Sequence, residues 1–378
     1  MKINSGLSRR TVLGGASLAI ISLFNTSAFA VVDDVKVGVI LPMTGATATF
    51  GQESFNGLSL ALELETGKPT LKLMLEDTQG TPSGSANAIN KLLTSDKVSV
   101  VMGEVASSNT IAASGAAQTA KVPLMTHAST NDTITIGKDF ISRICFVDSF
   151  QGKVMAQFAK ETLKAKTAVI VVDSDSDYSR GLKDSFTKAF TAEGGQIVQE
   201  VSYSQKDTDF KSQLTKVKKA KPDVVFIPGY YTQVGALLRQ ANELKIKAKF
   251  LGTDGWDSPD LFKVAGKASA GHYVSSHFAP DDTDPKVQEF VTGYKKKFNA
   301  TPGAMAALGY DAGKFLKSAI KVADSGEPTK IKDAINNFKG FEGITGKITL
   351  DSNRNAIKPA VILETSETGF KFHSRVNP

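Results

Sequence analysis

The sequence predicts an α/β protein built from two doubly wound parallel sheets. Short β-branched runs alternate with stretches of helical period; the alternation proceeds once to about Val147 and resumes at Thr167. The strand-like runs are apolar throughout, which is typical of parallel strands covered by helices on both faces. The 378 residues also exceed the length of one typical core. We therefore expect two domains, each with its own sheet.

Eight apolar runs are the expected strands. Five of them precede the break, at residues 35–41, 71–76, 98–102, 122–125 and 143–147, and three follow it, at residues 167–172, 224–228 and 250–253. Between them, residues 55–65 and 210–221 have helical periodicity, and Pro222 ends the second of these helices. A helix over residues 151–164 connects the two halves of the alternation.

The first thirty residues have the features of an export signal. Arg9 and Arg10 stand directly before a modest apolar stretch, and small residues precede a cleavage point after Ala30, as in twin-arginine signals. A membrane anchor would need about 18 apolar residues, whereas Gly14 and Gly15 interrupt this stretch early. We expect the signal to be removed and the mature protein to reside in the periplasm.

The composition excludes several classes of protein. Removal of the signal lowers the formal charge from +7 to +4, which is too mild to indicate a nucleic-acid partner. The lysines at 216–221 and 295–297 are typical of helix faces exposed to solvent. Cys145 is the only cysteine, so no intrachain disulfide can form, and its apolar surroundings predict a buried, inert thiol.

Catalytic, cofactor and metal motifs are missing from the strand-to-helix turns. There is no dinucleotide fingerprint, phosphate-binding loop or nucleophile elbow. The four histidines lack metal-ligand spacing. Residues 173–184 superficially copy a calcium loop, but Tyr178 stands where that loop needs glycine, and a capped helix start explains its aspartates better. We expect no enzyme activity, no cofactor and no metal.

Two hydroxyl-rich turns predict a seat for an anion. Residues 103–110 follow a buried strand and open a helix, so hydroxyls meet free backbone N–H groups at its positive end. Ordinary capping of that helix by Ser108 or Asn109 explains the motif equally well when it is taken alone. Residues 126–131 form a second such turn at the next strand end, which a parallel sheet places beside the first.

The second half of the chain supplies an acid and aromatic rings. Asp254 follows a strand in a glycine-flanked loop, where it could pair with an ammonium group or act only as a turn former. Several aromatic residues also lie in strand-end loops rather than in strands or helices, which suits a small-molecule pocket. They are Phe50, Tyr178, Tyr230, Tyr231 and Trp256.

With these motifs in place, the chain resembles the branched-chain amino-acid-binding proteins of ABC transporters, which have the type I periplasmic binding protein fold. The resemblance rests on residues 37–45, 103–110, 177–181, 229–241 and 252–255, and it covers essentially the whole mature chain. It implies two lobes joined by three crossover strands. The first lobe would be 31–150 with 276–349, and the second 151–275 with 350–378. It also implies a monomer that closes on its ligand and delivers it to a membrane permease.

The resemblance also assigns roles to residues of this chain. It implies that the ligand carboxylate is held by Ser107, Thr130 and the turn of Ala128 and Ser129, that its ammonium is held by Asp254, and that its side chain is enclosed by Phe50, Tyr178, Tyr230 and Trp256. Asp254 is shorter than the glutamate common in leucine binders, so an amino acid is better supported than leucine itself. An amide, a urea-like compound or an aromatic acid is the alternative ligand, and a secreted hydrolase is the alternative of another class.

Overall fold

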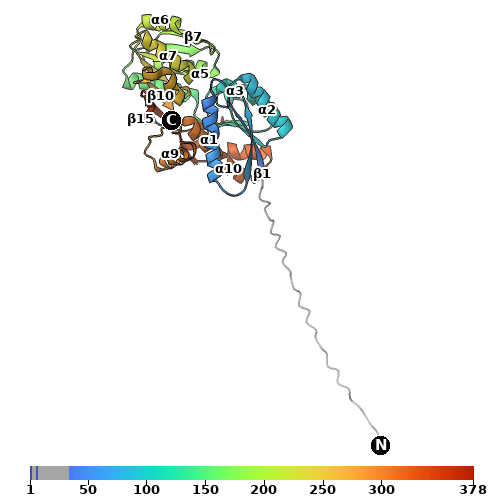
Figure 1. The fold of residues 1–378 in the computed structure, drawn as a ribbon. Helices are drawn as coiled ribbons and strands as arrows, with labels where there is room; N and C mark the ends of the chain where they lie inside the picture. Colours follow the sequence, from blue (N-terminus) through green and yellow to red (C-terminus); the bar gives the residue numbers. More distant parts are fainter. Residues whose placement is uncertain (2–5, 7–33) are drawn as a thin grey trace. The chain divides into compact units, whose positions relative to one another are not determined.

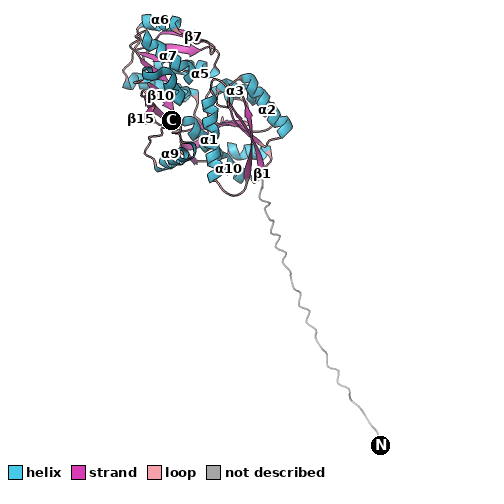
Figure 2. Cartoon of the chain, viewed as in Figure 1, coloured by secondary structure: helices cyan, strands magenta, loops and turns pink. Residues whose placement is uncertain are grey.

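The computed structural model describes residues 34–378, together with Met1 and Gly6. The predicted export signal and its cleavage point after Ala30 lie outside the described residues. From residue 34 onward the chain forms two main sheets with helices packed on them (Figure 1, Figure 2). The predicted α/β class with parallel sheets is confirmed. None of the helices described is long and apolar enough to cross a membrane.

The first sheet has five parallel strands in the order β2-β1-β3-β4-β5. Val37 on β1 lies beside Leu73 of β2 on one side and Val100 of β3 on the other. All four residues of β3 are buried, as expected of a strand covered on both faces. The strands are β1 (Asp34–Leu41), β2 (Thr70–Asp77), β3 (Val100–Gly103), β4 (Leu124–Thr126) and β5 (Ile141–Arg143), with helices α1 (Ala48–Leu64), α2 (Pro82–Lys91) and α3 (Ser107–Ala120).

The second sheet has seven strands in the order β15-β14-β10-β9-β8-β6-β7, and β14 alone runs antiparallel to its two neighbours, β10 and β15. The strands are β6 (Thr167–Asp173), β7 (Gln196–Tyr203), β8 (Val224–Phe226), β9 (Lys249–Gly252), β10 (Tyr273–Ser276), β14 (Ala360–Thr365) and β15 (Phe370–Val376). The helices of this half are α4 (Asp148–Gln157), α5 (Asp177–Ala192), α6 (Lys211–Ala220), α7 (Tyr231–Glu243) and α8 (Pro259–Ala265).

The chain returns to the first sheet between β10 and β14. Helix α10 (Ala304–Ala323) packs along α1 so closely that a Cβ on Gly57 would lie 1.9 Å from the carbonyl oxygen of Ala306. Glycine is therefore required at this helix crossing. The remaining elements of this segment are α9 (Pro285–Phe298), α11 (Pro328–Asn336) and a small antiparallel sheet of β11 (Phe341–Gly343), β12 (Gly346–Leu350) and β13 (Ala356–Ile357).

One local prediction is wrong, and one alternative explanation is excluded. The strand expected over 143–147 lies at Ile141–Arg143 instead, because its neighbour β4 ends at Thr126, the residue paired with Arg143. Helix α3 is not capped by Ser108 or Asn109, since it already begins at Ser107 and its N-cap residue makes no side-chain hydrogen bond. The hydroxyl groups at this helix start are therefore not used as caps.

Candidate ligand-binding site

The loops at the carboxyl ends of the two sheets face each other. The Ser108 hydroxyl accepts a 3.0 Å hydrogen bond from the backbone N–H of Asp177, and the Asn131 amide donates to the carbonyl of Asp177 at 2.8 Å. Further along, the Thr232 hydroxyl donates to the carbonyl of Ala46 at 2.8 Å. Ligands of doubly wound sheets bind beyond this edge. The site is therefore assembled from segments of both sheets.

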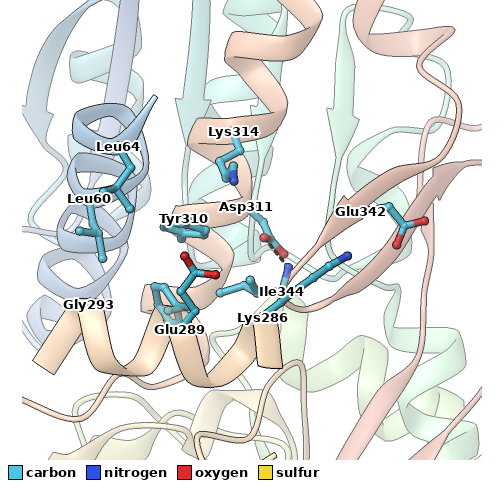
Figure 3. A pocket seen from close by; sticks show the side chains of 11 residues that line it. Leu60, Leu64, Lys286, Glu289, Gly293, Tyr310, Asp311, Lys314, Glu342 and Ile344 are labelled. Atoms are coloured by element: carbon cyan, nitrogen blue, oxygen red, sulfur yellow. Dashed lines mark hydrogen bonds between the residues drawn. The ribbon is translucent and has the colours of Figure 1, made fainter. Parts of the chain in front are cut away.

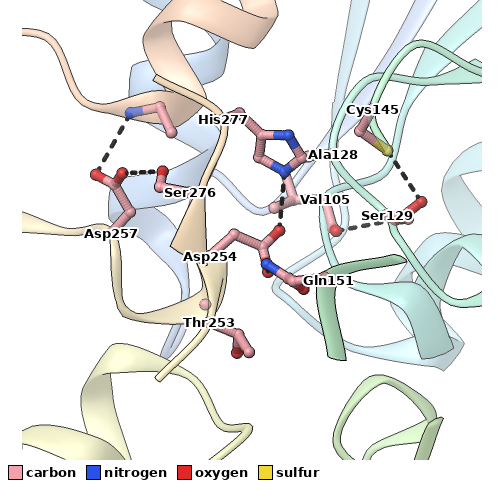
Figure 4. Close-up of polar contacts among 12 residues, drawn as sticks. Val105, Ala128, Ser129, Cys145, Gln151, Thr253, Asp254, Asp257, Ser276 and His277 are labelled. Atoms are coloured by element: carbon pink, nitrogen blue, oxygen red, sulfur yellow. Dashed lines mark hydrogen bonds and ion pairs between the residues drawn. The ribbon is translucent and has the colours of Figure 1, made fainter. Parts of the chain in front are cut away.

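Asp254 lies at the centre of this junction and is only 3% exposed. It begins a short 3₁₀ turn directly after β9. Its Oδ1 accepts hydrogen bonds from the Tyr178 hydroxyl at 2.6 Å and from Gln151 Nε2 at 2.9 Å. Its Oδ2 lies 3.1 Å from His277 Nε2 (Figure 4). Three neutral donor groups thus orient one carboxylate, and no lysine or arginine among residues 34–378 forms an ion pair with it.

Two histidines are part of the same buried region. Burial lowers the pKa of His277, which favours a neutral ring that donates from Nε2 to Asp254. The ring also stacks on Phe146 with centroids 3.7 Å apart. His127 contacts the Ser54 hydroxyl at 2.8 Å, and burial followed by the nearness of His277 lowers its pKa to about 3. The sequence analysis considered the histidines only as possible metal ligands and missed the contact of His277 with Asp254.

Asp148 is a second buried acid that sequence reasoning missed. It is the first residue of α4 and is fully buried, and its carboxyl group lies beside the Thr130 hydroxyl. Burial, reinforced by the charge of Asp254, raises its pKa well above the usual range. Its backbone N–H donates to the carbonyl of Thr130 at 2.9 Å, which places it beside the predicted anion seat. The site therefore contains two carboxyl groups without a cationic side chain bonded to either.

The two hydroxyl-rich turns lie together, as predicted. The Ser107 hydroxyl accepts from the backbone N–H of Asn131 at 3.2 Å and so joins the start of α3 to the second turn. The Thr130 hydroxyl is buried and lies beside the carboxyl group of Asp148. The Ser129 hydroxyl, in contrast, is committed to the loop, since it donates to the carbonyls of Glu104 and Val105 at 2.8 and 2.9 Å. Ser107 and Thr130 are the side chains of this seat that remain for a ligand, whereas the backbone N–H of Ala128 donates to the Thr126 hydroxyl at 3.3 Å.

Two ionisable side chains support these turns from beneath. Arg143 donates to the carbonyls of Ser129 and Asn131 at 3.0 and 2.7 Å, which fixes the second turn. Glu104 accepts from the Thr78 hydroxyl at 2.5 Å and from the backbone N–H of Ala106 at 2.7 Å, beside the start of α3. Burial raises the pKa of Glu104 to about 7, although these hydrogen bonds oppose the shift.

Three of the four predicted aromatic wall residues form one continuous group. The rings of Tyr178 and Tyr230 stack with centroids 5.1 Å apart, and Phe50 meets Tyr230 edge-on at 6.3 Å. Trp256 does not join them. Its side chain is fully buried, its indole N–H donates to the carbonyl of Ile227 at 2.9 Å, and it packs over Gly252. Trp256 therefore supports the Asp254 loop from the core.

Two cavities differ in their relation to this cluster. One of about 250 Å³ opens between the two sheets and is lined by Ala106, Asn109 and Tyr230 among others, so it adjoins the cluster. Another, of about 260 Å³, lies between α1, α9 and α10 and carries charges of both signs from Lys286, Glu289 and Lys314 (Figure 3). None of the predicted site residues lines it. No group of three or more possible metal ligands occurs among the described residues.

Comparison with known proteins identifies the family to which the chain belongs. A profile described as "Periplasmic binding protein" matches residues 34–369. The chain belongs to this family. The family consists of substrate-binding proteins of ABC transporters, which are periplasmic and are not enzymes.

Three solved structures show the extent of the similarity. A leucine-binding protein of Thermotoga maritima is 38% identical, with a TM-score of 0.88 over 91% of this chain and 99% of its own. A branched-chain amino acid substrate-binding protein of Streptococcus pneumoniae, in complex with isoleucine, is 30% identical, with a TM-score of 0.85 over 92% of this chain and 100% of its own. A solute-binding protein of Rhodopseudomonas palustris, in complex with 3,4-dihydroxybenzoic acid, is 26% identical, with a TM-score of 0.82 over 91% and 98%.

Proposed function

We propose that the protein binds an α-amino acid with an aliphatic, branched side chain and serves an ABC importer in the periplasm. The observation that carries the proposal is the pair of buried carboxyl groups, Asp254 and Asp148, neither of which forms an ion pair with a lysine or arginine of the described chain. Burial of a charge is costly unless an opposite charge or strong hydrogen bonds accompany it. An ammonium group placed at Asp254 would supply that charge.

The opposite end of the ligand would occupy the start of α3. Ser107 and Thr130 offer hydroxyl groups, and the first turn of α3 offers backbone N–H groups and a positive helix end. A ligand that carries both an ammonium and a carboxylate is an amino acid. The polar groups therefore favour the α-amino-acid head group over a ligand with only one charge.

The side chain of the ligand would contact the rings of Phe50, Tyr178 and Tyr230. These rings form a wall without an ionised group, which suits an aliphatic side chain. The relatives that bind leucine and isoleucine are 38% and 30% identical to this chain, whereas the relative that binds an aromatic acid is 26% identical. An amide or an aromatic acid lacks an ammonium and would leave the two acids uncompensated.

We further propose that the two sheets belong to two lobes, bounded as the sequence predicts, that close on the ligand. Ser107 and Thr130 lie at the first sheet, whereas Tyr178 and Asp254 lie at the second, so a bound amino acid would join them. Closure would let the membrane permease distinguish loaded from empty protein. The protein would act as an exported monomer without catalytic activity, and export would use the twin-arginine signal that ends at Ala30.

Calorimetry on the mature protein with three related compounds tests this proposal. Leucine carries both charged groups, 4-methylpentanoic acid lacks the ammonium, and 3-methylbutylamine lacks the carboxylate. We expect leucine to bind much more tightly than either analogue, and a saturating amino acid at 100 times its dissociation constant to stabilise the fold by about 2.7 kcal/mol. Stabilisation by an amide, a urea-like compound or 3,4-dihydroxybenzoic acid, with none by any amino acid, would contradict it. Turnover of a bound compound would instead support the alternative function, a secreted hydrolase.

A further inference from the structure

A groove at the amino edge of the second sheet is ringed by four lysines. Lys218 and Lys221 come from the end of α6, and Lys245 and Lys247 from the segment between α7 and β9 (Figure 1). All four side chains are exposed around a groove of about 350 Å³. The floor of the groove is apolar and is formed by Val217, Pro222, Ile246 and Ala248.

The positive charge here is not balanced by the surrounding chain. Residues 211–249 contain nine lysines and arginines but only Asp223 and Glu243 as acids, a formal charge of +7. Residues 31–378 as a whole carry +4, so the rest of the mature chain is slightly acidic. Asp223 is engaged elsewhere, since its carboxylate accepts from the backbone N–H groups of Lys166 and Thr167 at 2.8 Å. The positive excess of the mature protein is thus concentrated in this one stretch.

The fold itself does not use the four ammonium groups. No ion pair or hydrogen bond of Lys218, Lys221, Lys245 or Lys247 ammonium groups is found within residues 34–378. The carboxyl ends of α6 and α7 lie nearby, and each contributes about half a negative charge. Two such ends offset about one of the four positive charges, so most of the field remains available to a partner.

The chemistry of the groove selects among anionic partners. Lysine combines an aliphatic stem, which can cover an apolar surface, with an ammonium that reaches phosphate or water. Nucleic-acid sites that hold single strands add aromatic rings for base stacking, and sequence readers add arginine, whereas neither residue type lines this groove. An apolar floor inside a ring of lysines matches the glycerol and phosphate region of an anionic lipid bilayer.

From this charge complementarity, we propose that the groove formed by Lys218, Lys221, Lys245 and Lys247 docks the protein reversibly on an anionic phospholipid membrane. Lys247 precedes β9, whereas Asp254 follows that strand. The four residues of β9 span about 13 Å, so the groove and the amino-acid site lie at opposite edges of the sheet. Membrane docking would therefore keep the protein near the membrane without blocking its ligand site.

Vesicle co-flotation of the mature protein tests the proposal. Binding is expected to vesicles of phosphatidylcholine mixed with phosphatidylglycerol, to fall steeply as salt rises, and to be absent with phosphatidylcholine alone. A variant with all four lysines replaced by glutamine should bind the mixed vesicles at least tenfold more weakly, because each lysine near an anionic bilayer contributes about fivefold. The control replaces four exposed lysines of the other half of the chain, Lys295, Lys296, Lys330 and Lys339, by glutamine and should bind like the parent.

Each alternative outcome bears on the proposal. Equal loss in both quadruple variants would mean that net charge alone acts, and would overturn the assignment to this groove. Binding to heparin or polyphosphate without binding to mixed vesicles would assign the surface to a soluble polyanion instead and overturn the membrane partner. An unchanged melting temperature and unchanged leucine titration in the groove variant would show that its fold is intact. Failure of leucine to bind the parent would affect the proposed ligand but not this test.

Discussion

Replacement of Asp254 by asparagine isolates the proposed ammonium contact. Alanine would leave three donors stranded, namely Tyr178, Gln151 and His277. Asparagine keeps an oxygen for Tyr178 and Gln151. Its NH₂ group would face His277 Nε2, which can become an acceptor by moving the ring proton to Nδ1, a nitrogen that has no partner in the parent. The variant therefore removes the charge with little disturbance of the fold.

The loss of the charge should cost about 2–4 kcal/mol of leucine binding, or roughly 30- to 700-fold in the dissociation constant, because the buried ammonium loses its ionic partner. The assay is isothermal calorimetry on the parent and Asp254→Asn with leucine and with 4-methylpentanoic acid. The penalty should appear only with leucine, since the acid analogue has no ammonium. This difference separates an ionic contact from general damage to the site.

Asp257→Asn is the matched control. Asp257 is also a buried aspartate, three residues further along, but it accepts from the Ser276 hydroxyl at 2.6 Å and from the backbone N–H of Ala304 at 3.4 Å rather than from Tyr178 and Gln151. We expect little change in leucine affinity for this variant. Our assignment of Asp254 would be refuted if Asp254→Asn bound leucine as tightly as the parent, or if both ligands weakened equally.

Three further predictions concern the rest of the site. Ser107→Ala should weaken leucine and 4-methylpentanoic acid alike, by about 1–3 kcal/mol in calorimetry, because both carry the carboxylate. The ammonium of leucine should lower the raised pKa of Asp148, so leucine binding should release protons. Calorimetry in two buffers of different ionisation heat should detect this release in the parent but not in Asp148→Asn. Burial raises the pKa of Glu104 to about 7, so its contribution to the free energy of unfolding is fully present at low pH and falls by on the order of 3 kcal/mol as pH rises from about 4.5 through 7. The melting temperature of Glu104→Gln should therefore depend less on pH than that of the parent.

Most of the strands that sequence reasoning identified are apolar and buried on both faces, although β2, found over residues 71–76, is an edge strand without a fully buried residue. Strands such as β3 and β6 consist almost entirely of apolar residues, so the local sequence identifies them even when the strands that pair with them are unknown. Strand β7 was missed because it lies at the edge of the second sheet and leaves most of its residues partly or fully exposed. Strands β14 and β15 return from the far end of the chain to pair antiparallel, a long-range arrangement that local periodicity does not encode.

A similar limit applies to the site. Ser107, Thr130 and Asp254 could be found because parallel strands end at a common edge, so polar loops there are expected to converge. Asp148 and Gln151 reach the same place from the first turn of a helix, where acidic and polar residues are ordinary. His277 lies beyond the end of β10, and only the pairing of β10 beside β9 brings it to Asp254. Such contacts depend on sheet order, which the local sequence leaves open.

The two buried acids suggest how ligand binding could control the proposed closure. With the loops together, burial and then the charge of Asp254 raise the pKa of Asp148, so closure without a cation would have to bury a second charge or bind a proton. An ammonium beside both groups would remove that cost, while the ligand carboxylate would join Ser107 and Thr130 to the same assembly. A ligand with both charges would thus stabilise the closed arrangement far more than one with either charge alone, which is the differential affinity that a population shift requires. Selectivity for amino acids and control of closure would then arise from the same pair of carboxyl groups.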